Sequence, residues 1–238
     1  MNCKNCQTEV NLNYCPECGQ PVSLNRINGH YVIHEIVEVL ICEKGILYTI
    51  RELLTRPGEN IRHFLTENRS RLVKPIIFIL VTSLLYTLVN HFFHIEEGYV
   101  QFDLGTKSSI GIIFKWIQHD YGYANIIMGI FIAIWIKIFF RKYDYNFYEI
   151  LILLCFVMGI AMLIFTFFAL FQGLTKINLM QIAGFLGVAY CTWAIGQFFD
   201  KKKPVNFVKA FASYMLGLIT FTLTAILLGT LIDLMIKH

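Results

Sequence analysis

The sequence LYTIRELLTRPGENIRHFLTENRSRLVKP, residues 47–75, separates two chemically different parts of the chain. Four cysteines with the spacing of metal ligands precede it, and about five hydrophobic runs long enough to cross a bilayer follow it. Apolar residues recur at helical spacing on both sides of Arg56-Pro57-Gly58, and a proline both restricts the residue before it and suits the first turn of a helix. We call this stretch the hinge segment and predict that it forms two short amphipathic helices joined by an elbow.

The composition indicates an integral membrane protein. Of the 238 residues, 56% are hydrophobic, 15% are charged and 21 are phenylalanine, which exceeds the usual profile of soluble proteins. The formal net charge is only +4, and the sequence lacks the basic patch of a nucleic-acid-binding protein, so we expect no nucleic-acid partner. Residues 1–20 are polar and contain no apolar segment of a signal peptide, so we expect the N-terminus to stay in the cytosol.

Two C-x-x-C pairs predict a metal site within residues 1–22. Cys3 and Cys6 form the first pair and Cys15 and Cys18 the second, with eight residues between the pairs. Four thiolates so spaced can bind one tetrahedral ion, and so short a segment has no core without such a ligand. We therefore predict a zinc ribbon with structural Zn²⁺. Iron in the same geometry and a redox dithiol pair are the alternatives, whereas the reducing cytosol disfavours disulfides.

Residues 28–74 are predicted to form amphipathic helices at the cytosolic face of the membrane. Such a basic segment next to a transmembrane run is expected to lie on the anionic leaflet, where each Lys or Arg contributes ~1 kcal/mol. A cytosolic helical subdomain whose charges face water is the alternative. The cations of the hinge segment are Arg56, Arg62, Arg69, Arg71 and Lys74.

Residues 75–238 are predicted to form a transmembrane helical bundle with spans at about 75–94, 123–140, 147–171, 179–199 and 205–236. If the hinge segment is cytosolic, the cations Arg141-Lys142 and those at residues 201–203 also fall on the cytosolic side, as short cytoplasmic loops require. Five spans then place the C-terminus outside. A short amphipathic helix is expected in the outer loop between Ile110 and Ile117. The predicted fold class is an all-α polytopic membrane protein with a small N-terminal zinc ribbon and amphipathic juxtamembrane helices.

The spans offer few groups for chemistry. Their middles contain no Asp, Glu, Lys, Arg or His, which counts against proton-coupled transporters and intramembrane enzymes. Glu149, at the start of the third span, is the most suggestive charge. Together with Arg56, Arg62 and Arg69 it forms a candidate interfacial site. The plainer interpretation is that Glu149 is an acid favoured by the N-terminal end of a helix dipole.

The chain resembles a family of uncharacterised bacterial inner-membrane proteins, catalogued as a domain of unknown function with an N-terminal zinc ribbon. The resemblance rests on the ribbon, on GILYTIRELLTRPGENIRHFLTENRSRLVKPIIFILV at 45–81, on YDYNFYEILILL at 143–154 and on AYCTWAIGQFFDKKKPVNFVKAFASYML at 189–216. Glu149 matches a glutamate that relatives usually follow with a histidine. Ile150 stands there in this chain, which counts against a role built on an acid-histidine pair. The most specific positions of the match are Thr49, Leu53, Arg56, Pro57, Gly58, Arg69 and Pro75.

From these features we predict a non-enzymatic scaffold or accessory subunit of the bacterial inner membrane. It would bind the lipid bilayer and, through the ribbon or the basic hinge segment, a protein partner; a homo-oligomer stays open. A transporter or channel subunit is the first alternative and would need a polar path. A membrane enzyme acting on lipid at the cytosolic interface is the second alternative, and it would need the interfacial residues to converge on a pocket. The polar path would be lined by Gln181, Gln197, Asn206 and Thr220.

Overall fold

The computed structural model describes residues 8–9, 16–17, 45–67, 71–93, 95 and 109–237. The chain divides into two units, residues 1–40 and 41–238, and each is considered by itself. In the first unit the Thr8 hydroxyl donates a hydrogen bond of 2.8 Å to the Glu17 carboxylate. The four cysteines of the predicted ribbon lie outside the described residues, so the zinc ribbon stays a prediction.

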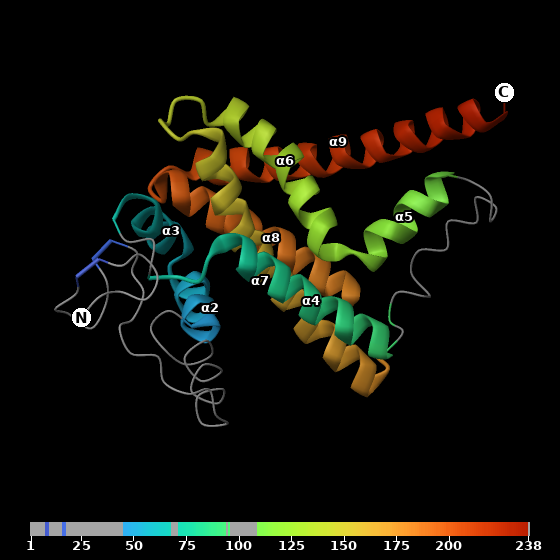
Figure 1. Ribbon diagram of the computed structural model, residues 1–238, viewed down its shortest axis with the longest axis horizontal. Coiled ribbons are helices and arrows are strands. Elements are labelled where there is room, and N and C mark those ends of the chain that lie inside the picture. The colour runs from blue at the N-terminus through green and yellow to red at the C-terminus, as the bar shows by residue number, and fades with distance from the viewer. Residues whose placement is uncertain are drawn as a thin grey trace. The chain divides into compact units, whose positions relative to one another are not determined.

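The described residues of the second unit form eight helices (Figure 1), which agrees with the predicted all-α class. Two short helices come first, then one span, then a short helix, then four more spans. Their bounds are α2 Ile46–Thr55, α3 Pro57–Thr66, α4 Pro75–Phe93, α5 Ser109–His119, α6 Tyr121–Phe139, α7 Phe147–Thr175, α8 Met180–Asp200 and α9 Pro204–Lys237.

Five of these helices, α4, α6, α7, α8 and α9, are long and apolar enough to cross a membrane, as predicted. The third span is longer than the prediction, because α7 continues past Phe171 to Thr175. Hydrophobicity alone marks an end at the polar Gln172, whereas the helix ends where Lys176 adopts a left-handed conformation with φ 62°. A left-handed residue is a common stop for a helix.

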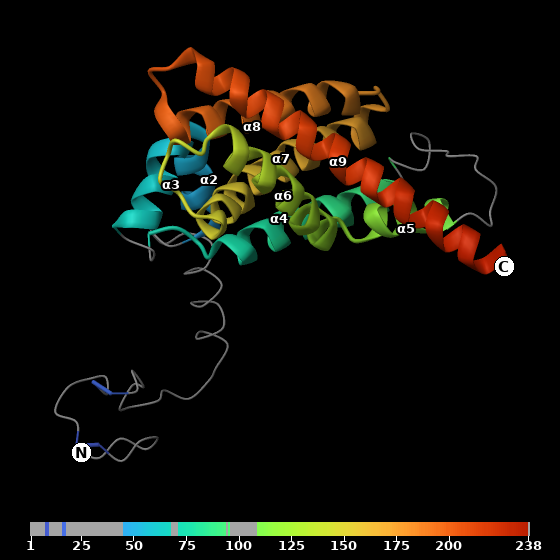
Figure 2. The ribbon, with the colours of Figure 1, turned by 90° about the horizontal axis from the view of Figure 1, so that it is seen from above.

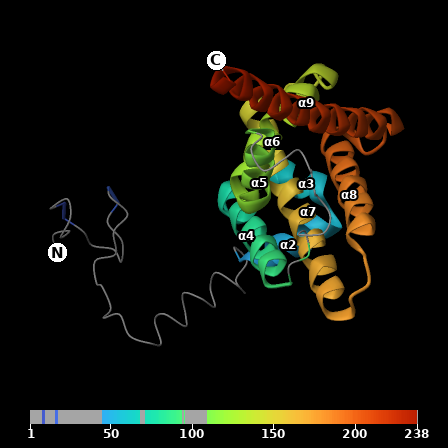
Figure 3. The same ribbon diagram turned by 90° about the vertical axis from the view of Figure 1, so that its right-hand side faces the viewer.

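Helix α7 is the centre of the bundle. Apart from Thr166, residues 150–171 of α7 carry no hydroxyl, amide or charged side chain, and a helix that is apolar all round is normally buried. Figure 3 shows α7 between α4 and α8, with α9 crossing one side of the bundle. Phe78 of α4, Phe156 of α7 and Phe198 of α8 are fully buried in the same hydrophobic core.

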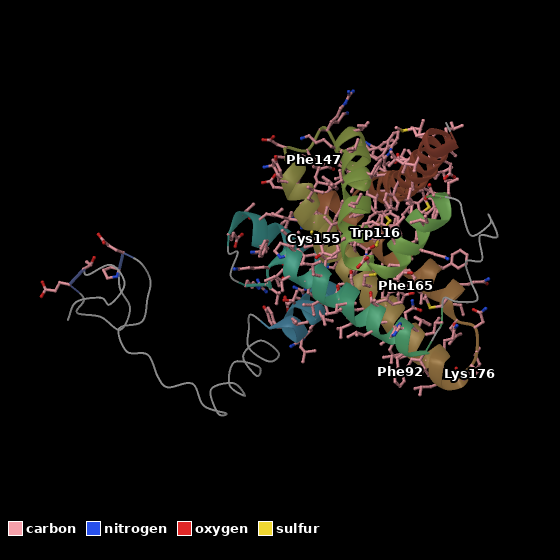
Figure 4. All side chains as sticks on the ribbon, turned by 45° about the vertical axis from the view of Figure 1, so that its right-hand side comes forward. Phe92, Trp116, Phe147, Cys155, Phe165 and Lys176 are labelled. Carbon is pink, nitrogen blue, oxygen red and sulfur yellow. The ribbon has the colours of Figure 1, made fainter. Side chains whose placement is uncertain are left out.

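The groups of cations that the sequence predicts on one side lie at one end of the bundle. The Phe140 and Phe199 rings stack at 3.9 Å, which joins the end of α6 to the end of α8. Arg141-Lys142 and residues 201–203 follow directly in the chain. In Figure 4, Phe147 at the start of α7 marks this end, and Lys176 and Phe92 lie together at the opposite end. We call the former the cation end.

Helix α5 is the amphipathic helix expected in the outer loop, and it packs against the C-terminal part of α9 (Figures 1 and 2). A Cβ atom on Gly229 would lie 2.8 Å from the Ile110 Cα, so the two helices touch through a glycine. The Ser109 backbone N–H donates 2.8 Å to the Asp233 carboxylate, which caps the start of α5. Gly229 therefore allows α5 and α9 to pack closely within the chain.

Candidate functional site

The predicted elbow is present and is closed by a side chain of its own. Helix α2 ends at Thr55, α3 begins at Pro57, and Arg56 between them has φ −142° and ψ 61°. The Asn60 side-chain amide donates to the Glu52 carbonyl at 2.9 Å and to the Arg56 carbonyl at 3.0 Å. The last carbonyls of a helix lack partners within it, so Asn60 fixes the angle between α2 and α3.

The chain that follows α3 folds back onto α2. The Val73 backbone N–H donates to the Thr49 hydroxyl at 3.1 Å, and Thr49 is completely buried. The Arg71 guanidinium donates to the Tyr48 hydroxyl at 3.0 Å and to the Glu52 carboxylate at 3.1 Å. The Tyr48 hydrogen bond raises the pKa of Arg71, so its charge is retained. Arg71, one of the cations of the hinge segment, is therefore bound within the elbow.

The elbow is attached to α8 by a close backbone contact. A Cβ atom on Gly58 would lie 2.4 Å from the Gln197 carbonyl carbon and 2.6 Å from the Phe198 nitrogen. Only a glycine allows α3 to approach so closely. The Tyr190 hydroxyl adds a second link, donating 3.0 Å to the Leu53 carbonyl of α2.

Arg62 strengthens this attachment. Its Nη1 donates to the Gln197 carbonyl at 2.7 Å and to the Phe198 carbonyl at 2.6 Å. Both carbonyls belong to the last turn of α8, where backbone acceptors lack helical partners and the helix dipole is negative. Arg62 therefore acts as a cationic cap of α8, in addition to any role at the membrane surface.

Glu149 closes a capping box at the start of α7. Its backbone N–H donates 2.9 Å to the Asn146 side-chain oxygen, and its carboxylate accepts 2.7 Å from the Asn146 backbone N–H. This geometry satisfies two N–H groups at the helix start. Of the two interpretations of Glu149 drawn from the sequence, the structure describes the acid of a helix N-terminus.

The four residues of the candidate interfacial site are brought together only in part. Arg62 and Glu149 both act on the Tyr145 hydroxyl: burial raises the pKa of Tyr145, Arg62 lowers it and Glu149 raises it. Arg56 is exposed at the elbow, and Arg69 lies outside the described residues. Tyr145 was not singled out from the sequence, where it is only an aromatic residue directly before a helix cap. In the structure its ring lies 4.6 Å from that of Phe198.

The residues proposed for a polar path do not gather in one place. Gln181 and Gln197 lie at opposite ends of α8, about 24 Å apart at the rise of a helix. The Asn206 amide donates to the Tyr143 hydroxyl at 2.9 Å, and the Thr220 hydroxyl accepts from the Trp135 indole at 3.2 Å. Asn206 and Thr220 are therefore each bonded to a side chain of the bundle and do not form a shared path.

Helix α2 also presents apolar side chains to the outside. Leu47 is 57% exposed and Leu54 48% exposed, beside the exposed Arg51. Ile50 and Leu54 close one end of an apolar groove of about 550 Å³ between α7 and α8. Exposed leucines next to an arginine are typical of a helix lying in the membrane interface, which supports the predicted contact with lipid.

The comparisons with known proteins point to this same region. A family model described as "Protein of unknown function (DUF3667)" matches residues 43–87, which contain α2, α3 and most of α4. No curated protein and no solved structure matches the chain. The similarity to a domain of unknown function is thus located on the elbow and the first span.

Proposed function

We propose that this chain is a non-enzymatic scaffold or accessory subunit of a bacterial inner membrane, which presents a cytosolic zinc ribbon to a protein partner. The observation that carries the proposal is the attachment of the elbow to the bundle. Gly58, Arg62 and Tyr190 tie α2 and α3 to the transmembrane helices, so the elbow is held firmly on the membrane-anchored bundle.

The use of charges at the cation end supports a structural role. Arg62 is occupied by two α8 carbonyls, and the Glu149 carboxylate by the cap of α7. A catalytic acid or base needs access to the proton that it transfers. A protein-binding role makes no such demand on these side chains.

The proposed ribbon uses Cys3, Cys6, Cys15 and Cys18 as ligands of a structural Zn²⁺. A Cys₄ site stabilises a small domain that has no core of its own, and it leaves the surface of that domain free for a partner. In the second unit, Arg51 and Arg56 are exposed and give the surface of the elbow positive charge. An acidic partner surface would complement them.

The alternative of a membrane enzyme retains one favourable observation at the cation end. Arg62 binds the Phe198 carbonyl, the Tyr145 ring packs against the Phe198 ring, and Glu149 binds the N–H of the residue after Tyr145. If this cluster acts on lipid, Tyr145→Phe should change the lipid composition of the membrane without lowering the amount of protein. Unchanged lipid composition would remove the alternative.

The scaffold proposal is tested by affinity purification in a mild detergent, with zinc content measured on the same sample. The chain offers a matched pair of variants: Cys15→Ser removes a proposed ligand, whereas Cys42→Ser removes a cysteine outside the C-x-x-C pairs. We expect Cys15→Ser to lose zinc and partner together and Cys42→Ser to keep both. Recovery of the same partners whether or not zinc is bound would exclude the ribbon from the proposed interface.

A further inference from the structure

A narrow apolar groove of about 330 Å³ lies between α4, α6 and α7. Its walls include Ile79 of α4, Gly129 and Ile130 of α6, and Leu151 and Cys155 of α7. Figure 4 marks Cys155 on α7, between Phe147 at the cation end and Phe165. The groove therefore lies in the half of α7 nearest the cation end.

The groove has one polar side chain in its lining that is paired within the bundle, and it is open to the outside. Asn125, which lines it, is buried and donates 3.2 Å to the buried Ser83 hydroxyl. Ile130 is 39% exposed and Tyr148 is 75% exposed, so the groove opens on the outer surface of the bundle. In a chain that spans a membrane, such an opening faces hydrocarbon.

A basic side chain lies on the same helix face as the groove. Ile126 and Ile130 line the groove, and Lys137 follows Ile130 by seven residues, which is two helical turns on the same face. Lys137 is exposed, and its ammonium donates 2.6 Å to the Tyr145 carbonyl at the cation end. An ammonium group has three donors, so this carbonyl does not exhaust it.

The dimensions of the groove decide what can occupy it. A helix is about 10 Å across with its side chains, so it would fill 330 Å³ in less than one turn. A helix of a second copy would therefore lie across the groove and would not fill it. A flexible hydrocarbon chain can, and a lipid with an anionic headgroup also matches Lys137 in charge.

We propose that this groove binds one acyl chain of an anionic phospholipid, whose phosphate pairs with Lys137. The apolar walls on three helices hold the acyl chain, and the headgroup lies at the cation end beside the exposed ring of Tyr148. The site is separate from the elbow and does not depend on the ribbon or on a protein partner.

Native mass spectrometry of the full chain in detergent, with added phosphatidylglycerol or phosphatidylcholine, tests this site. A Lys or Arg near an anionic surface contributes an amount of binding energy equivalent to about fivefold in affinity. We expect Lys137→Gln to weaken phosphatidylglycerol binding about fivefold and phosphatidylcholine binding less, because the choline cation offsets the charge of the phosphate in phosphatidylcholine. Lys142→Gln, an exposed cation at the same end, is the control and should retain wild-type binding.

A second pair of variants tests the groove itself. Gly129→Leu should fill it, because a Cβ there meets only the Met158 sulfur at 3.7 Å, and one bound lipid per chain should be lost. Gly184→Leu is the control, since nothing lies within 4 Å of its Cβ position. Equal lipid retention by these two variants would overturn the groove as the site. Equal phosphatidylglycerol affinity of Lys137→Gln and wild type would overturn the headgroup pairing.

Discussion

Replacement of Gly58 by alanine is expected to force the elbow away from the bundle. The new Cβ would lie 2.4 Å and 2.5 Å from the carbon and oxygen of the Gln197 carbonyl, and 2.6 Å from the Phe198 nitrogen. These are backbone atoms, which cannot turn aside as a side chain can. Overpacking of this kind lowers the free energy of unfolding by ~1–3 kcal/mol. The loss is larger if the two Arg62 hydrogen bonds to the same turn also lengthen.

The assay is thermal unfolding of the detergent-purified chain, followed by intrinsic fluorescence. For a chain of this size each kcal/mol lowers the midpoint by roughly 2–4 °C. Gly184→Ala is the control, because its Cβ meets nothing within 4 Å and alanine is favoured over glycine in a helix by ~0.5–1 kcal/mol. An unfolding midpoint of Gly58→Ala equal to that of the wild type would show that α8 does not press against position 58.

Three further changes follow from the contacts at the cation end. Arg62→Met should lower the free energy of unfolding by ~1–3 kcal/mol, because two carbonyls at the end of α8 lose their donor. Arg51→Met, at an exposed site, is the control and should change it by no more than ~0.5 kcal/mol. Equal free energies of unfolding for the two variants would contradict the role of Arg62 as a cap. Asn146→Ala should cost ~1 kcal/mol in the same assay through loss of the α7 capping box, and an unchanged midpoint would show that the box does not stabilise the helix. Burial raises the pKa of Tyr145 above its ordinary value of 10.0, so the neutral phenol stabilises the folded chain below pH 10 and this stability is lost as the pH rises further. Above pH 10 the unfolding midpoint of Tyr145→Phe should therefore decline less than that of the wild type. Equal declines of the two midpoints would argue against the raised pKa.

Local sequence signals were sufficient for the elements of the fold. Apolar runs long enough for a bilayer predicted the five spans, because hydrophobic length is a property of each segment alone. Arg56-Pro57-Gly58 likewise predicted the elbow, since proline limits the conformation of its neighbour. The charges of Arg141-Lys142 and of residues 201–203 likewise predicted that these two loops lie at the same end of the bundle.

The contacts between elements could not be predicted in this way. Arg62 was selected as a cation of the membrane surface, whereas its partners are α8 carbonyls more than a hundred residues away in the chain. The glycine at position 58 could equally have served the turn alone, and only the packed structure reveals that α8 lies against it. Tyr145 carried no motif, although it is the residue on which Arg62 and Glu149 both act.

The proposed topology places the cation end, with the elbow, in the cytosol. Cysteine substitutions at three exposed lysines test it with a membrane-impermeant thiol reagent, and labelling of the seven native cysteines in the wild-type chain gives the background. Lys142→Cys and Lys202→Cys lie at the cation end, and Lys176→Cys lies at the opposite end of α7. We predict that intact cells label Lys176→Cys alone, and that the other two are labelled only after the membrane is permeabilised. Labelling of Lys142→Cys and Lys202→Cys in intact cells, with Lys176→Cys protected, would contradict the account.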